Sequence, residues 1–216
     1  MSFKILNLQA LKNATQHQEP FPYMIIDNII IPERLTAVLE SFPVLSNRGS
    51  FPLNALSCSG AFGTLMEELQ HPDLRKIIAE RFQMDLEEKP PMITVRGHTT
   101  ERDGQIHVDS VSKLITFLLY LNPNWEAPGG RLRLLYNKRD LAPYAAEIAP
   151  EAGRCLIFKV TPNCWHGHEV FTGERRSIQL NYVTSDAARE RHLKVHRFSS
   201  FLKKLFFKKD AANSSY

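Results

Sequence analysis

A histidine and an aspartate lie two residues apart in the stretch GQIHVDS, residues 104–110. If this stretch ends a strand, His107 and Asp109 share one face and Val108 lies on the other, because successive strand side chains alternate. An imidazole and a carboxylate on one face suit a metal ion, but two ligands do not complete a site. With eight histidines in the chain, this spacing arises easily by chance. The prediction therefore depends on further ligands elsewhere.

Residues 161–183, TPNCWHGHEVFTGERRSIQLNYV, contain the further candidates. His166 lies where a loop passes into a β-prone run. Two imidazoles and one carboxylate on adjacent coordination positions form the facial triad of non-haem Fe(II) oxygenases, which leaves three positions open for a bidentate co-substrate and dioxygen. A second histidine in this stretch could therefore complete such a set of ligands with His107 and Asp109. No cysteine is needed for this chemistry.

An arginine pair follows at residues 175–176, on the next β-prone run. In a strand, Arg175, Ser177 and Gln179 share one face, and Arg176 points the other way. A 2-oxo-dicarboxylate that chelates iron through its keto acid end leaves its far carboxylate buried. A buried carboxylate is costly unless it is paired, and the planar guanidinium can pair with it bidentately. The pair therefore offers a guanidinium for this role, and alternation allows only one of the two to face the site.

The elements that must position these residues change in character along the chain. Residues 20–30 are β-rich, 31–43 are predicted as a helix with Pro32 in its first turn, and 44–63 are predicted as loop. Residues 71–86 have helical spacing of apolar side chains. From Pro91 onward, short β-prone runs alternate with turn residues, which is typical of a sandwich, barrel or jelly roll. These runs cover residues 91–97, 105–110, 113–122, 131–137, 154–160 and 175–183.

Length and composition indicate one globular domain of ordinary character. The chain has 216 residues, of which 43% are hydrophobic and 23% charged. We expect one domain over residues 1–185, with a helical part over 1–90 and a β-rich core over 91–185. A separate tail covers residues 186–216. No stretch reaches the roughly 20 apolar residues of a membrane span, and the start lacks a secretory signal. The odd number of cysteines favours a reducing, cytoplasmic setting without disulfides.

The basic charge of the chain is concentrated in the tail. Residues 186–216 hold eight Lys/Arg against three Asp/Glu, a balance of +5, so the net +4 leaves about −1 for residues 1–185. We therefore expect no nucleic-acid partner. The tail spaces its apolar residues as one face of a basic amphipathic helix, suited to the domain itself, another subunit, a partner or a membrane surface. These residues are Phe198, Phe201, Leu202, Leu205 and Phe206.

Several blocks of the β-rich half, taken in order, resemble a known family. HVDS, LITFLLYLNPNW, GGRLRLLY, CLIFKV, WHGHEV and GERRSIQLNYV together resemble the 2-oxoglutarate- and Fe(II)-dependent dioxygenases of the prolyl-4-hydroxylase-like branch. The resemblance covers residues 91–184. The opening PFPYMIIDNIIIPERL also resembles the strand and helix that precede the core in many such proteins.

The resemblance implies an α+β fold: a double-stranded β-helix (jelly roll) core, N-terminal helices packed on one side and a C-terminal amphipathic helix. It implies that His107, Asp109 and His166 are iron ligands and that Arg175 holds the far carboxylate of 2-oxoglutarate. Tyr120 matches a position from which a tyrosine hydroxyl often supports that carboxylate. The implied reaction uses Fe(II), 2-oxoglutarate and O2, releases succinate and CO2 and hydroxylates a C–H bond. Whether ascorbate is also needed stays open.

Two of these assignments have alternatives within the same motifs. WHGHEV offers His168 as well as His166 as the distal ligand, and His166 is favoured because its spacing to Arg175 then needs no gap. Arg176 is the alternative to Arg175. The chain also departs from the family at Asn181, where many relatives carry a tryptophan, and this predicts a different or more polar pocket wall.

The predicted function is an Fe(II)- and 2-oxoglutarate-dependent dioxygenase acting on a peptidyl, amino-acid or saccharide substrate. The alternative is a metal-binding cupin-like jelly roll, an isomerase or sensor, that does not turn over 2-oxoglutarate. Arg175 separates the two, because a cupin isomerase has no need for a lone cation that faces the metal from inside the barrel. The sequence does not identify the substrate, since fold-level analogy is a poor guide to it.

Overall fold

Helices come first along the chain and strands dominate afterwards in the computed structural model, which describes residues 3–45 and 48–194. The helices are α1 (Leu8–Asn13), α2 (Pro32–Glu40), α3 (Gly60–Leu69) and α4 (Pro72–Phe82), with a 3-10 turn η1 (Leu53–Ala55). The strands are β1 (Gln16–His17), β2 (Tyr23–Ile26), β3 (Ser50–Pro52), β4 (Pro91–Thr99), β5 (Lys113–Tyr120), β6 (Leu132–Leu135), β7 (Tyr144–Ile148), β8 (Cys155–Lys159), β9 (His166–Gly167) and β10 (Gly173–Val183). Residues 186–194 form a further helix.

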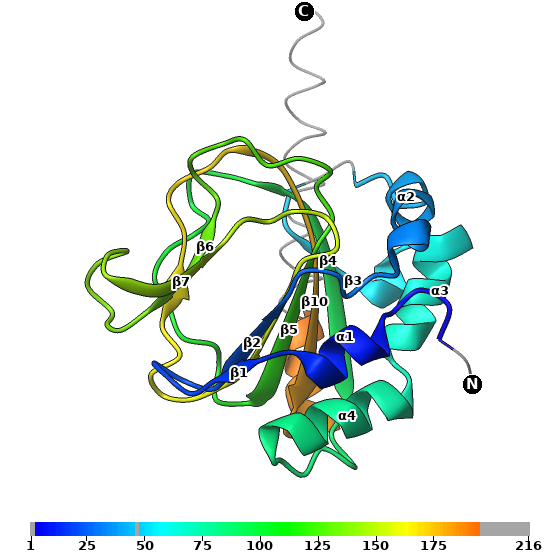
Figure 1. Ribbon diagram of the computed structural model, residues 1–216, viewed down its shortest axis with the longest axis horizontal. Coiled ribbons are helices and arrows are strands. Elements are labelled where there is room, and N and C mark those ends of the chain that lie inside the picture. Colours follow the sequence, from blue (N-terminus) through cyan, green and yellow to red (C-terminus); the bar gives the residue numbers. More distant parts are fainter. Residues whose placement is uncertain (1–2, 46–47, 195–216) are drawn as a thin grey trace, which may run out of the picture.

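Two antiparallel sheets make up the β-rich part. The large sheet has seven strands in the order β1-β2-β8-β5-β10-β4-β3, and the small sheet has three in the order β7-β6-β9. Figure 1 shows β6 and β7 standing opposite the long strands β5 and β10. Two facing antiparallel sheets of this kind are the architecture of a jelly roll. The predicted double-stranded β-helix core, with helices before and after it, is confirmed.

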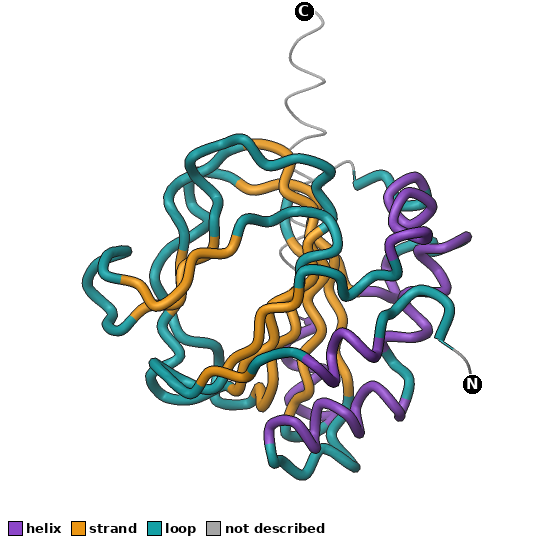
Figure 2. The backbone as a smooth tube through the Cα atoms, in the orientation of Figure 1, coloured by secondary structure: helices purple, strands orange, loops and turns teal. Residues whose placement is uncertain are grey.

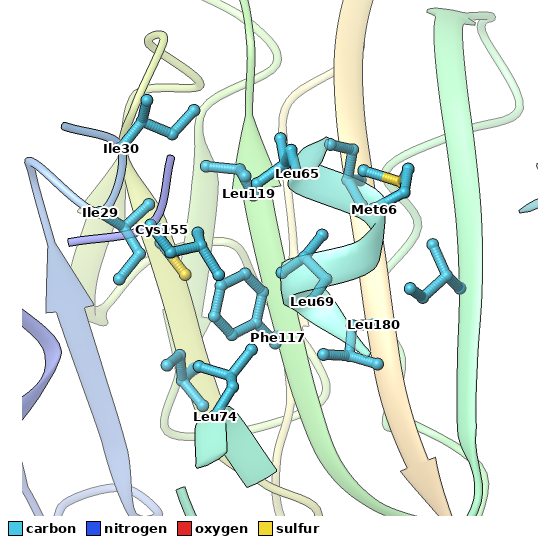
Figure 3. Close-up of a cluster of buried hydrophobic side chains, with 14 of the residues drawn as sticks. Ile29, Ile30, Leu65, Met66, Leu69, Leu74, Phe117, Leu119, Cys155 and Leu180 are labelled. Carbon is cyan, nitrogen blue, oxygen red and sulfur yellow. The ribbon is translucent and has the colours of Figure 1, made fainter. Parts of the chain in front are cut away.

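The N-terminal helices cover the side of the large sheet that faces away from the small sheet (Figure 2). Leu65 and Leu69 of α3 pack there with Phe117 and Leu119 of β5 and with Leu180 of β10, and all five are fully buried (Figure 3). Burying one such side chain stabilises a fold by about 1.5–3 kcal/mol. This packing fixes the direction of β5 and β10, and therefore of the side chains on their opposite face.

The opposite face of the large sheet looks into the space between the sheets. Leu156 and Phe158 of β8 and Tyr120 of β5 meet Leu132 and Leu134 of β6 in a second, smaller apolar cluster. Beside this cluster the same face becomes polar. Its polar residues are Thr94, Arg96, Thr116, Arg175, Ser177 and Gln179, which line a cavity between the sheets.

Two local predictions are wrong. Residues 44–63 were predicted as loop, but they contain β3, η1 and the start of α3. β3 has only three residues and gains its hydrogen bonds by pairing with the distant strand β4, so nothing local in the sequence marks it. Residues 105–110 were predicted as a strand end, but only His107 forms a bridge, to His166, and the segment is otherwise irregular.

The predicted amphipathic stripe from Phe198 to Phe206 lies outside the described residues, so its helix and its partners stay predictions. None of the helices in the described part of the chain is long and apolar enough to cross a membrane. The three cysteines are free, and Cys155 and Cys164 are buried among apolar side chains, as expected for packing residues.

Candidate metal and co-substrate site

His107, Asp109 and His166 converge at one end of the space between the sheets. One ligand atom from each lies within 4.8 Å of the others. The two imidazole ring centroids are 4.3 Å apart. The backbones of His107 and His166 exchange two hydrogen bonds of 3.0 Å each, which tie the irregular 105–110 segment to β9. His107 and Asp109 thus lie close together, although the segment that carries them is not a regular strand.

Both histidine rings are oriented by backbone carbonyl groups. Nδ1 of His107 lies 2.8 Å from the carbonyl oxygen of Gln105, and Nδ1 of His166 lies 2.8 Å from that of Cys164. A carbonyl oxygen only accepts, so each neutral ring carries its hydrogen on Nδ1. Nε2 of each ring is then left with a free lone pair. This is the usual arrangement of metal-ligating histidines.

The charge states of the buried Asp109 and His166 side chains suit a divalent cation. Burial alone would raise the pKa of Asp109, but the Lys113 ammonium, His166 and hydrogen bonds outweigh it, and the pKa falls below its usual range. Burial, and next the nearby His107, lowers the pKa of His166 to about 4. At neutral pH the carboxylate is therefore ionised and the imidazole neutral, which are the forms that bind metals.

Contacts with the large sheet hold the Asp109 carboxylate. Lys113 Nζ donates to Oδ1 at 2.7 Å, and Thr116 Oγ1 donates to Oδ2. Asn181 Nδ2 in turn donates to Thr116 Oγ1 at 2.8 Å. Sequence reasoning did not find the roles of Thr116 and Lys113. The sequence could have indicated the role of Thr116, because Thr116 and Tyr120 are four residues apart on β5 and therefore lie on the same face of the strand.

His168 is not one of the three side chains that converge. It follows His166 by two residues and lines the same cavity, but its Nδ1 lies 2.8 Å from the backbone carbonyl oxygen of Glu169. Burial, and next the positive Arg175, lowers the pKa of His168 to about 4, so its ring is neutral. Among the described residues the geometry thus places His166, and not His168, beside His107 and Asp109.

Arg175 lies deeper in the same cavity and is only 5% exposed. Its Nε donates to the carbonyl oxygen of Gly130 at 2.9 Å, and Nη2 donates to the Tyr120 hydroxyl oxygen at 3.4 Å. The guanidinium carbon lies 5.1 Å from the centroid of the Tyr120 ring. Within residues 3–45 and 48–194 it forms no ion pair with an acidic side chain. A buried charge without a partner is costly, so the site is suited to an anionic ligand.

Arg176 points away from the cavity, as the alternation of the strand predicted. Its guanidinium pairs with Glu174 and lies 5.2 Å from the centroid of the Phe42 ring on the helix-covered side of the sheet. Of the two arginines, only Arg175 lines the cavity that also contains His107, Asp109 and His166.

Replacing Gly130 with alanine is expected to weaken the fold and disturb Arg175. Gly130 has φ +76°, and an added Cβ would lie 2.6 Å from Cζ2 of Trp125. A left-handed backbone costs other residues about 1–2 kcal/mol, and overpacking costs about 1–3 kcal/mol. We expect urea denaturation to show a free energy of unfolding lower by about 2–5 kcal/mol.

Gly153→Ala is the matched control, because Gly153 has φ +83° but its added Cβ would meet nothing closer than 3.6 Å. It should lose only the backbone contribution of about 1–2 kcal/mol. Equal losses in the two variants would contradict the steric part of this prediction.

Comparisons with known proteins agree with this geometry. Residues 95–183 match the model of the 2OG-Fe(II) oxygenase superfamily, and they include all five predicted site residues. The fold is similar to the crystal structure of a Pseudomonas putida prolyl-4-hydroxylase, at 18% identity and TM-score 0.52, over 76% of this chain and 92% of that one. It is also similar to a viral collagen prolyl hydroxylase from Paramecium Bursaria Chlorella virus-1, at 14% identity and TM-score 0.50, over 76% and 90%.

No curated protein matches the chain in sequence. The solved structures, at such low identity, show the likeness of fold alone. The family model matches the segment in which the two imidazoles and the carboxylate meet. Over residues 95–183 the chain is therefore similar to the 2OG-Fe(II) oxygenase superfamily.

Proposed function

We propose that this oxygenase hydroxylates a C–H bond of its substrate, and that His107, Asp109 and His166 hold its ferrous ion. The donor set supports this assignment, since two imidazoles and one carboxylate suit Fe(II) and leave positions open. When bound, Fe(II) with 2-oxoglutarate and O2 supplies the oxidising power, with release of succinate and CO2. The residues of the chain bind, orient and shield these reactants.

The single observation that carries the 2-oxoglutarate assignment is the buried Arg175 guanidinium. It shares a cavity with the three ligands and has no acidic partner among the described residues. A dicarboxylate that reaches from the metal to this guanidinium would neutralise it with charge-assisted hydrogen bonds. The same observation disfavours the alternative, a cupin-like isomerase or sensor without 2-oxoglutarate turnover, because such a site needs no buried cation there.

Tyr120 supports the same end of the site. Its hydroxyl oxygen accepts from Arg175, so its own hydrogen is free to be donated to a carboxylate. Burial raises the pKa of Tyr120, against the opposing effect of Arg175, so the hydroxyl keeps that hydrogen at neutral pH. We infer that Tyr120 orients the guanidinium and contributes a second donor to 2-oxoglutarate.

The substrate we propose is peptidyl, an amino acid or a saccharide. The structural neighbours are a prolyl-4-hydroxylase and a collagen prolyl hydroxylase, which makes a peptidyl substrate one candidate. The cavity wall beyond the metal ligands is polar, which favours a substrate portion with hydrogen-bonding groups. This wall includes Ser50, Thr94, Arg96, Asp103, Gln105 and Gln179.

We further propose that residues 1–185 are one oxygenase domain in a reducing compartment such as the cytoplasm. The N-terminal helices share one continuous apolar core with the large sheet, which supports a single folding unit. The three cysteines are free, which supports a reducing environment.

The test is succinate formation from 2-oxoglutarate without added substrate, after anaerobic loading with Fe(II) and exposure to O2. Wild type is expected to form succinate slowly, and His107→Ala and Arg175→Ala are expected to form little or none. Parallel reactions with and without ascorbate show whether it is needed. Equal succinate from all three proteins would overturn the proposal.

A further inference from the structure

The metal ligand Asp109 lies on an irregular segment, and two buried side chains of the large sheet hold it there. Asp109, Thr116 and Asn181 are 7%, 2% and 1% exposed. Thr116 Oγ1 contacts Asp109 Oδ2, and Asn181 Nδ2 lies 2.8 Å from Thr116 Oγ1. Thr116 and Asn181 are direct cross-strand partners on β5 and β10. The position of the pair is therefore set by the register of the sheet and not by the segment that carries Asp109.

The chemistry of the donors and acceptors determines the direction of each hydrogen bond from Asn181 through Thr116 to Asp109. An amide nitrogen only donates and a carbonyl oxygen only accepts. Asn181 Nδ2 lies between Thr116 Oγ1 and the carbonyl oxygen of Ile115, at 2.8 and 3.5 Å, so the nitrogen must be the atom that points there. Thr116 then accepts from Asn181, and its single hydrogen is left for Asp109. An ionised carboxylate only accepts, so every donor in this series of hydrogen bonds meets an acceptor.

We propose that Asn181 and Thr116 are positioning residues that set the orientation of the Asp109 carboxylate and thereby the affinity of the site for its divalent cation. Thr116 holds Oδ2, and the Lys113 ammonium donates to Oδ1, so both carboxylate oxygens have a fixed direction in this structure. Asn181 acts through Thr116, because it prevents the hydroxyl from turning its hydrogen elsewhere. This inference rests on the proposed function, since it assumes that Asp109 is a metal ligand.

The polar residue at position 181 has a physical reason in this arrangement. Asn181 is fully enclosed, and burying an amide is costly unless its donors are used. Its contacts with Thr116 and Ile115 use them. An apolar side chain at position 181 would fill the same space but would leave the Thr116 hydroxyl without a donor to fix its direction.

The experiment measures the affinity of the metal-free, full-length protein for Mn²⁺ by calorimetric titration without O2. Mn²⁺ accepts imidazole and carboxylate ligands and does not oxidise under these conditions. Loss of a hydrogen-bonding partner of a metal ligand typically lowers metal affinity about 10–100-fold. We expect the Mn²⁺ Kd to rise about 10–100-fold in Thr116→Val, to rise less in Asn181→Leu, and to stay near wild type in Thr116→Ser, which keeps the hydroxyl.

The double variant gives the sharpest result. Because Asn181 acts through Thr116, Thr116→Val with Asn181→Leu should bind Mn²⁺ as weakly as Thr116→Val alone. Thr99→Val is the matched control, since Thr99 is equally buried but donates to the carbonyl oxygen of Phe171, away from the three ligands. Its Kd should equal that of wild type, although it too loses one buried hydrogen bond.

The outcomes separate this inference from the proposed function. If wild type and His107→Ala fail alike to bind Mn²⁺, both are overturned. If wild type binds and His107→Ala does not, while Thr116→Val binds as wild type does, only the positioning role is overturned. If the losses of Mn²⁺ affinity in the two single variants add up in the double variant, the positioning role is also overturned. A Kd that rises in Thr116→Ser as much as in Thr116→Val would show that packing, and not the hydroxyl, matters, and would equally overturn it.

Discussion

Replacing Arg175 with methionine is expected to raise the KM for 2-oxoglutarate by about 100-fold or more, because an unpaired buried carboxylate costs about 3–5 kcal/mol. Methionine keeps most of the buried volume but removes the charge and every donor. The guanidinium is 5% exposed and contacts Gly130 and Tyr120. The measurement is succinate formation as a function of 2-oxoglutarate concentration, with Mn²⁺ affinity as the test that the metal site remains intact.

Arg176→Met is the matched control for this experiment. It changes the same residue type one position along β10, but its guanidinium pairs with Glu174 outside the cavity. Surface changes of this kind alter stability by about 0.5 kcal/mol or less, and the KM should stay within about twofold of wild type. A large increase in KM for Arg176→Met with none for Arg175→Met would reverse the assignment of the two arginines.

Replacing His166 with alanine is expected to raise the Mn²⁺ Kd by more than about 100-fold, since loss of a ligand exceeds the loss of a supporting contact. His166 lies with His107 and Asp109 inside 4.8 Å, and its Nδ1 hydrogen is engaged by Cys164 so that Nε2 is free. Succinate formation should fall with metal affinity. The affinity is measured by the same calorimetric titration in the absence of O2.

His168→Ala tests the alternative that His168, and not His166, is the distal metal ligand in the WHGHEV motif. His168 is as buried as His166 and also neutral, but it does not converge with His107 and Asp109. Its removal should change the Mn²⁺ Kd by only about threefold or less, as expected for a site without a shared contact. Loss of metal binding in His168→Ala with retention in His166→Ala would show that the distal ligand is His168.

The outline of the fold could be predicted because hydrophobic pattern and turn residues are local signals. Short β-prone runs bounded by turn residues predicted β4, β5, β8 and β10, and helical spacing of apolar residues predicted α4. β7, Tyr144–Ile148, was not predicted, since its two alanines have little strand preference and its pairing with β6 supplies its hydrogen bonds. Short strands such as β3 and β7 exist only where a distant partner strand offers an edge.

The sequence by itself determined which chemistry is available, namely two imidazoles, one carboxylate and an arginine on one face of a strand. It could not decide between His166 and His168 or give the partners of Asp109, because both depend on contacts across the chain. Only the tertiary structure decided that His107 and His166 share backbone hydrogen bonds, that Arg175 is enclosed without an acidic partner among the described residues, and that Asn181 stands beside Thr116. The physical reason is that residue type and alternation are properties of a strand, whereas burial, register and charge pairing arise only when distant strands pack.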